Sequence, residues 1–143
     1  MIGFRPPRIA LTTLALAAVA DAIGGGRLVV HAPHVAAGIA GLFLMLWGWR
    51  LFVTSRVAIR PTPETVRLVT HGPYRMTRNP IYLGLALMLL GVAVWRGSAP
   101  YYVATLVFFS IIDRIACRFE EAKLTARFGD EYRRYARRVR RWM

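Results

Sequence analysis

The chain has 143 residues, of which 56% are hydrophobic, and its mean hydropathy is +0.40. A water-soluble domain of this length cannot bury so much apolar surface, so the composition favours one domain that exposes part of its surface to lipid. The net charge of +13 would suit a nucleic-acid binder, but the arginines flank apolar runs, so anionic lipid headgroups are the expected partner and nucleic acid is not. Cys117 is the single cysteine, which excludes an intrachain disulfide and a thiolate metal cluster.

Four apolar runs follow in chain order, at about residues 9–22, 35–53, 81–95 and 99–116. Each is near the length that crosses a bilayer core of about 30 Å, although all but the second are short. They predict an all-α integral membrane protein with about four transmembrane helices, built as a single domain over residues 1–143.

The connections between these runs predict their arrangement. Only Arg96-Gly97-Ser98 separates the last two runs, which predicts a tight antiparallel hairpin. A glycine cluster at residues 24–26 with Pro33 beyond it predicts a loop between the first two. Basic residues gather before the first run, between the second and third, and after the fourth. This pattern places both termini on the cytoplasmic side of the membrane.

The first run has a second interpretation. Arg5 and Arg8 precede it, and Ala18-Val19-Ala20 ends it, which together are typical of a signal peptide with a cleavage site. A retained first span is the preferred interpretation, and cleavage is the alternative.

The stretch from residue 68 to residue 84 gathers aromatic, basic and turn-forming residues at the entry to the third run. Gly72-Pro73 predicts a turn, and Asn79-Pro80 predicts a helix start with Asn79 as N-cap and Pro80 in the first turn. Free N–H groups at such a start favour an anion. An ordinary interfacial belt, with Tyr74 and Tyr82 as anchors, explains the same residues equally well.

A second polar stretch lies where the fourth run meets the cytoplasm. Arg114 and Arg118 are one helical turn apart, and Glu121 follows Arg114 by about two turns, so these side chains can share a face. Glu120 and Glu121 are two of only seven acidic residues. The alternative interpretation is a set of solvated ion pairs at a helix end.

The tail, residues 117–143, predicts an amphipathic cytoplasmic helical segment. Its apolar and aromatic residues recur at steps of three and four, namely Phe128, Tyr132, Tyr135, Val139 and Trp142. Gly129 predicts the end of one helix, and Asp130 predicts the N-cap of the next. Arginines cover the opposite face, which is typical of a helix lying on an anionic membrane surface. The three histidines are scattered, so no metal site is expected.

Three ordered blocks between residues 61 and 142 resemble the isoprenylcysteine carboxyl methyltransferase and phospholipid methyltransferase superfamily of membrane enzymes. The blocks are Leu68-Val69-Thr70-x-Gly72-Pro73-Tyr74-Arg75, then Arg78-Asn79-Pro80-x-Tyr82-x-Gly84, and then Glu120-Glu121-x-x-Leu124-x-x-x-Phe128-Gly129-x-x-Tyr132-x-x-Tyr135 with Val139. The first two runs match only as generic apolar helices.

The resemblance implies S-adenosyl-L-methionine as methyl donor and a lipophilic acceptor, either a prenylcysteine-like carboxylate or a lipid amine, at the cytoplasmic face of a bacterial inner membrane. By this analogy the cofactor-binding residues are Leu68, Val69, Gly72, Tyr74, Arg78, Asn79, Pro80, Tyr82 and Glu120. Arg114 and Arg118 would orient an anionic acceptor. Glu121 is the candidate to take a proton from an amine.

One position departs from the prenylcysteine enzymes, which usually carry histidine where this chain has Asn79. Asparagine cannot act as a general base, and Asn-Pro is similar to the phospholipid branch and to many bacterial members. The identity of the acceptor therefore stays open. The sequence does not predict the oligomeric state. The rival interpretation is a non-enzymatic scaffold that binds anionic lipid or a partner through the arginine-rich tail, and a small transporter is the third.

Overall fold

The computed structural model describes residues 6–24, 35–36, 38–43, 46–47, 50 and 67–143. Over these residues the chain is helical and contains no strand, which confirms the all-α prediction for this part. The elements are α1 (Pro6–Gly24), η1 (Gly72–Arg75), α3 (Pro80–Arg96), α4 (Ala99–Ile111), η2 (Ile112–Cys117), α5 (Arg118–Phe128) and α6 (Asp130–Arg138). The predicted loop around residues 25–34 lies outside the described residues, as does part of the second predicted span, 35–53.

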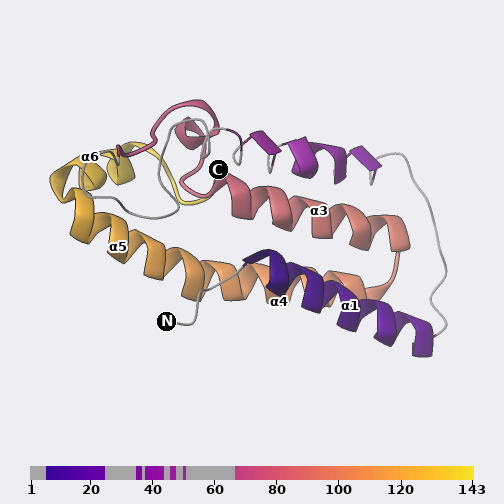
Figure 1. Ribbon diagram of the computed structural model, residues 1–143. Helices are drawn as coiled ribbons and strands as arrows, with labels where there is room; N and C mark the ends of the chain where they lie inside the picture. Colours follow the sequence, from indigo (N-terminus) through magenta and orange to yellow (C-terminus); the bar gives the residue numbers. More distant parts are fainter. Residues whose placement is uncertain (1–5, 25–34, 37, 44–45, 48–49, 51–66) are drawn as a thin grey trace.

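The helices α3 and α4 form the predicted hairpin (Figure 1). Gly97 ends α3 in the left-handed conformation with φ 62°, and its N–H donates to the carbonyl of Ala93 at 2.9 Å. Glycine adopts this conformation without the steric penalty of a Cβ. Ser98 then occupies the N-cap position of α4, and Pro100 lies in its first turn. The two-residue connection, Gly97-Ser98, therefore reverses the chain as the sequence predicts.

The long arm of the hairpin runs without a break from α4 through η2 into α5 (Figure 1). The residues at both junctions, Ile112 and Arg118, keep right-handed helical dihedrals. The η2 segment is a π-helical turn, in which hydrogen bonds skip one residue more than in an α-helix. The predicted fourth span, 99–116, is thus the first part of a rod that carries the polar stretch beyond it.

The other helices pack along this hairpin. Helix α1 lies against α4, and the described helical residues between 35 and 50 lie along α3 (Figure 1). Gly41 makes this second contact close, because a Cβ built there would stand 2.8 Å from the carbonyl oxygen of Gly84 and 2.6 Å from the backbone nitrogen of Met88. The bare backbone of Gly84 therefore serves helix packing.

A buried polar cluster holds α1 to the turn of the hairpin. Asp21 is 3% exposed and accepts hydrogen bonds from the guanidinium of Arg96 and from the hydroxyl of Ser98. The guanidinium of Arg96 also lies 5.5 Å from the ring centroid of Tyr101. A buried carboxylate needs such partners. The cluster therefore sets the position of α1 along the axis of the hairpin.

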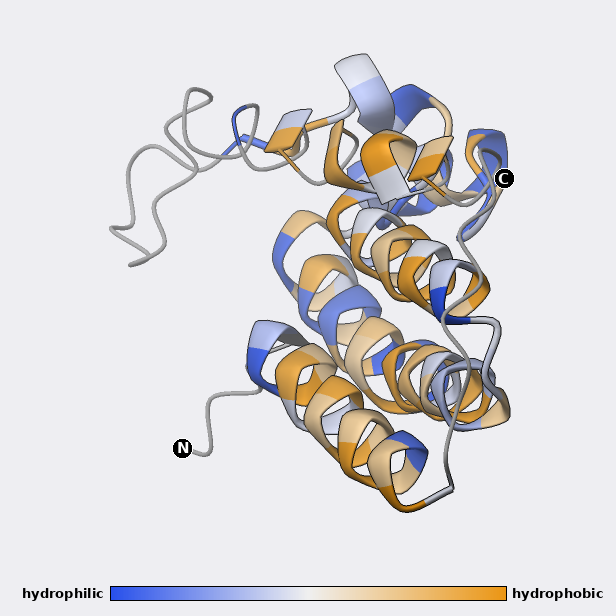
Figure 2. Ribbon diagram, turned by 90° about the vertical axis from the view of Figure 1, so that its right-hand side faces the viewer, coloured by the Kyte–Doolittle hydropathy of each residue, from blue (hydrophilic) through white to orange (hydrophobic). Residues whose placement is uncertain are grey.

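Apolar residues cover much of the helical bundle (Figure 2). The inner core includes Phe108 and Ile112, both fully buried. Other large apolar side chains are exposed, among them Leu16 and Ile23 on α1 and Leu106 on α4. Among the described helices, α1 alone combines the length and hydropathy of a membrane span, and α3 is a shorter apolar helix.

Candidate functional site

A cavity of about 410 Å³ lies at the end of the hairpin away from its turn, within the usual range for small-molecule sites of about 300–1,000 Å³. Its walls come from the segment before η1, from η1, from the first turn of α3, and from α5 and α6. Of the nine residues predicted to bind a cofactor, all but Gly72 line it, namely Leu68, Val69, Tyr74, Arg78, Asn79, Pro80, Tyr82 and Glu120. The structure thus brings together residues from two distant parts of the chain.

Gly72 does not line the cavity. It begins η1 with φ 61°, a conformation that glycine adopts readily. Gly72 and Pro73 form the predicted turn as the first two residues of η1, and Pro73 is buried. Gly72 therefore shapes the loop that carries Tyr74.

Tyr82 and Glu120 face each other across the cavity. The Tyr82 hydroxyl donates a hydrogen bond to Oε1 of Glu120. Glu120 is exposed as a whole residue, but desolvation of its carboxyl group raises its pKa, and the hydrogen bond from Tyr82 opposes this rise. A carboxylate that has no ion-pair partner among the described residues and lies beside aromatic rings suits a ligand that carries positive charge or hydroxyl groups.

Asn79 presents a buried donor at the cavity wall. It occupies the N-cap position of α3 as predicted, with Pro80 as the first helical residue, but its side chain makes no capping hydrogen bond. Its backbone N–H instead donates to Oγ1 of Thr77 at 3.2 Å. The side-chain Nδ2 is buried and has no partner among the described residues. A buried donor left unpaired is costly, so a ligand that accepts this hydrogen bond would stabilise the site.

Glu121 also lines the cavity, but its carboxylate is already paired. Arg141 donates to both oxygens, from Nε at 2.8 Å and from Nη2 at 2.6 Å, and Nη2 of Arg78 lies 3.4 Å from Oε1. Both oxygens of this carboxylate are therefore in contact with guanidinium groups. The role of Glu121 as a base stays a prediction. In the structure its carboxylate binds Arg141 and contacts Arg78.

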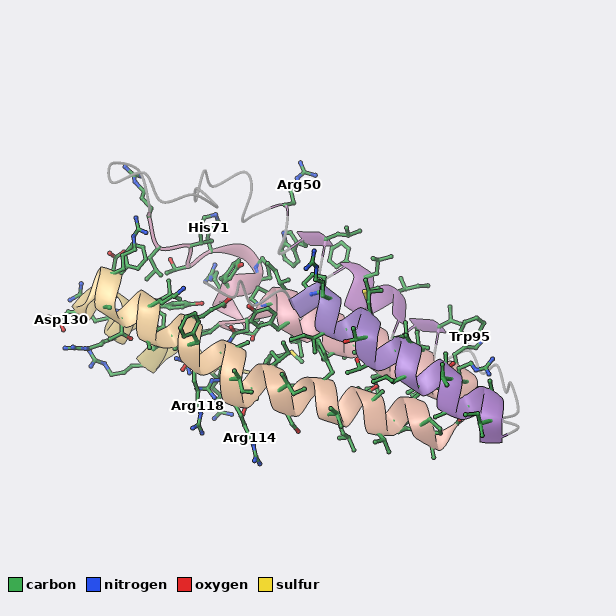
Figure 3. All side chains as sticks on the ribbon, turned by 60° about the horizontal axis from the view of Figure 1, so that its bottom comes forward. Arg50, His71, Trp95, Arg114, Arg118 and Asp130 are labelled. Carbon is green, nitrogen blue, oxygen red and sulfur yellow. The ribbon has the colours of Figure 1, made fainter. Side chains whose placement is uncertain are left out.

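Arg114 and Arg118 are not at the cavity. Both are exposed, and both side chains project outward from the long helix, away from the other helices (Figure 3). An acceptor that used either arginine would have to extend beyond the cavity. Their predicted role in orienting an anionic acceptor is therefore not supported by their position.

The structure adds wall residues that the sequence analysis did not assign to the cofactor, namely Arg67, Ile81, Lys123, Leu124, Arg127, Phe128, Tyr132 and Tyr135. Most belong to α5 and α6, where the recurrence of aromatic residues at steps of three and four was the available signal. Tyr135 is buried, and its hydroxyl donates to the backbone carbonyl of Tyr74 at 2.8 Å. Burial raises the pKa of Tyr74 to about 12.

This arrangement corrects one prediction. The apolar face of α6 does not lie on a membrane surface, because Tyr132 and Tyr135 are buried against the protein, and Trp142 packs on Phe109 with ring centroids 4.8 Å apart. The helix also begins at Asp130 with Gly129 in the N-cap position, one residue earlier than predicted. Its exposed arginines remain on the outer face.

Comparisons with known proteins show which family the sequence of this chain resembles. The family model described as phospholipid methyltransferase matches residues 35–131. The chain is 35% identical over 75 residues to the protein-S-isoprenylcysteine O-methyltransferase of Schizosaccharomyces pombe, which covers 50% of this chain and 30% of that protein. It is 32% identical over 124 residues to the methanethiol S-methyltransferase of Mycobacterium tuberculosis, which covers 72% of this chain and 48% of that protein.

A third relative is an uncharacterized protein of Haemophilus influenzae, 40% identical over 63 residues that make up 44% of this chain and 100% of that protein. The chain spans less than half the length of the two named methyltransferases. No solved structure matches it significantly.

Proposed function

We propose, because this chain belongs to the phospholipid methyltransferase family as its sequence blocks predict, that it transfers a methyl group from S-adenosylmethionine to a lipophilic acceptor. The observation that carries the proposal is the shared cavity, in which Tyr82 and Asn79 from the start of α3 meet Glu120 from α5. A scaffold has no need to bring these side chains around a space of about 410 Å³.

The residues of the cavity fit the cofactor. The carboxylate of Glu120 suits its ammonium group or its ribose hydroxyls, and the unpaired Nδ2 of Asn79 suits one of its acceptor atoms. The rings of Tyr74 and Tyr82 give aromatic surface for a base and for a sulfonium. The cofactor supplies a methyl group already activated by the positive sulfur.

The chain's own contribution is to hold two reactants in line and to exclude water. Such positioning contributes about 7–11 kcal/mol to the lowering of a barrier. A carboxylate or thiolate acceptor attacks the methyl carbon without a protein base, which is consistent with Asn79 at the position where a histidine is usual. The relatives are named for O-methylation and for S-methylation, so both kinds of acceptor belong in a screen.

We further propose that α1, α3 and α4, with the segment 35–53, cross a bacterial inner membrane and leave α5 and α6 on the cytoplasmic side. The exposed apolar residues of α1 and α4 support contact with lipid. The exposed arginines of α6 suit anionic headgroups at the rim. The cavity then opens at the membrane surface, where a lipophilic acceptor arrives from the bilayer.

Isothermal titration of the detergent-purified chain with S-adenosylmethionine and with S-adenosylhomocysteine tests the proposal directly. Binding of both is expected. A well-folded sample that binds neither, yet loses its affinity for anionic liposomes when the exposed arginines of α6 become glutamine, would instead support the scaffold. A screen of prenylcysteine, thiol and lipid-amine acceptors with radiolabelled methyl donor then identifies the acceptor.

A further inference from the structure

Residues Val139–Trp142, which follow α6, form a segment that we call the C-terminal strap. After α6 ends, Val139 adopts extended dihedrals of φ −119° and ψ 126°, and the chain runs back across the loop before α3. Two hydrogen bonds attach it there. Oγ1 of Thr77 donates to the carbonyl of Arg141 at 2.7 Å, and the N–H of Arg78 donates to the carbonyl of Arg140 at 3.1 Å.

The side chains of the strap reach the opposite wall. Nη1 of Arg141 donates to Oδ1 of Asp113 at 3.0 Å, in addition to its two hydrogen bonds to Glu121. The indole N–H of Trp142 donates to the same oxygen of Asp113 at 2.8 Å. The strap therefore joins the loop before α3 to η2 and to α5. The loop and α5 lie on two sides of the cavity.

The π-helical turn explains how one guanidinium reaches two carboxylates. Asp113 and Glu121 are eight residues apart, and in an ideal α-helix this spacing rotates the second side chain by about 80° from the first. The extra residue of a π-turn removes about 100° of rotation, which leaves the two side chains within about 20° of each other. The turn at Ile112–Cys117 contains Asp113 and ends before Glu121, and so it aligns the two side chains toward Arg141.

Glu121 transmits this contact to the cavity. Its Oε1 receives Nε of Arg141 at 2.8 Å and lies 3.4 Å from Nη2 of Arg78, the neighbour of Asn79 in the wall. The side chains of Arg78, Glu121 and Arg141 are 17%, 19% and 25% exposed, so solvent screens the chain of charges only in part. Among the described contacts the adjacent Glu120 takes no part in it, and its hydrogen-bond partner is Tyr82.

We propose that Arg141 is a positioning residue of the cofactor pocket. It pairs with Glu121, holds Arg78 and Asn79 in place through that carboxylate and through the strap, and leaves Glu120 as the carboxylate that meets the ligand. This proposal rests on the proposed function, since the ligand it serves is S-adenosylmethionine.

Cofactor titration of Arg141→Ala, Arg141→Lys and Arg138→Ala tests the proposal. Arg141→Ala should weaken binding at least tenfold. Arg141→Lys should recover part of the loss, because lysine keeps the charge but lacks the two-pronged geometry of the guanidinium. Arg138→Ala is the matched control, since Arg138 is exposed at the end of α6, and it should stay within twofold of wild type.

A double-mutant cycle distinguishes positioning from general destabilisation. If Arg141 acts through Glu121, Arg141→Ala should cost much less in a Glu121→Gln background than in the wild type. Full additivity of the two substitutions, or wild-type affinity of Arg141→Ala, would overturn the proposal.

Amide hydrogen exchange on the cofactor-free chain separates this proposal from the proposed function. Arg141→Ala should accelerate exchange at residues 77–83, where the strap is attached, and leave α1 unchanged. The milder Asp113→Asn should do so to a smaller extent. If the wild-type chain binds no cofactor, the proposed function fails, and unchanged exchange at residues 77–83 separately rejects the role of the strap.

Discussion

The hydroxyl of Tyr82 donates a hydrogen bond to the carboxylate of Glu120, two residues 38 positions apart in the sequence. The contact spans the cavity from the first turn of α3 to the first turn of α5. It links the second sequence block to the third, and among the described residues the other oxygen of Glu120 accepts no hydrogen bond. The cavity is therefore bounded by residues that the sequence blocks assign to one site.

Removing either member of this pair should weaken cofactor binding. We expect Glu120→Ala and Tyr82→Ala each to raise the dissociation constant for S-adenosylmethionine at least tenfold, which is a loss of about 1.4 kcal/mol or more. Glu131→Ala removes an exposed carboxylate from α6 and is the matched control. Wild-type affinity in both cavity variants would remove the site assignment.

Cofactor binding should also depend on pH through Glu120. Desolvation raises the pKa of this carboxyl above its ordinary value of about 4.3, and protonation removes the charge that attracts a cationic ligand. Affinity should therefore fall as the pH is lowered, and it should begin to fall at a higher pH than a solvated carboxylate would allow. Titrations between about pH 7.5 and pH 5 measure this dependence, and Glu120→Gln should flatten it.

Tyr135→Phe should loosen the wall formed by η1. The substitution deletes the hydrogen bond to the carbonyl of Tyr74 and leaves that carbonyl without its partner, at a cost of about 1 kcal/mol. Chemical unfolding in detergent measures the loss. Tyr102→Phe is the control, because Tyr102 is 38% exposed on α4, and it should change stability by less than half as much.

Two glycines in the second apolar run should respond differently to alanine. Gly41→Ala pushes a methyl group into the backbone of α3, and overpacking of this kind costs about 1–3 kcal/mol. A Cβ added at Gly38 would meet nothing within 4 Å, so Gly38→Ala should be neutral or stabilising through helix propensity. Thermal unfolding of the two variants measures their changes in stability. Equal changes would contradict the packing of this segment on α3.

Local signals in the sequence predicted the hairpin and the helix starts well. Gly97 supplies the left-handed residue that ends α3, and Pro80 and Pro100 each lie in a first turn where a missing N–H costs nothing. Such signals act over a few residues, so they are readable from the chain alone. The prediction that Tyr82 and Glu120 belong to one site came from the resemblance of the blocks to a known family, because no local rule pairs residues so far apart in the sequence.

The roles of the tail residues could not be predicted in the same way. Periodicity shows that α6 has an apolar face, but it does not say whether lipid or protein covers that face, and Tyr132 and Tyr135 are covered by protein. In the sequence, Arg141 is one of several arginines in a basic run. Its pairing with Asp113 and Glu121 depends on the C-terminal strap, which does not follow the helical periodicity. The π-turn has no sequence signature comparable to glycine or proline, and it decides which carboxylates share a face.

The cavity lies where the two arms of a single hairpin end together, and this has a consequence for how such chains can change length. One additional turn inserted into α3 alone would shift Tyr82 along the axis by about 5.4 Å relative to Glu120 and separate the pair. A compensating turn in α4 would restore the match and move the Gly97 reversal outward. In the membrane orientation proposed above, the length of the hairpin can therefore match the thickness of the bilayer while the pair at its base stays the same, provided that both helices lengthen equally.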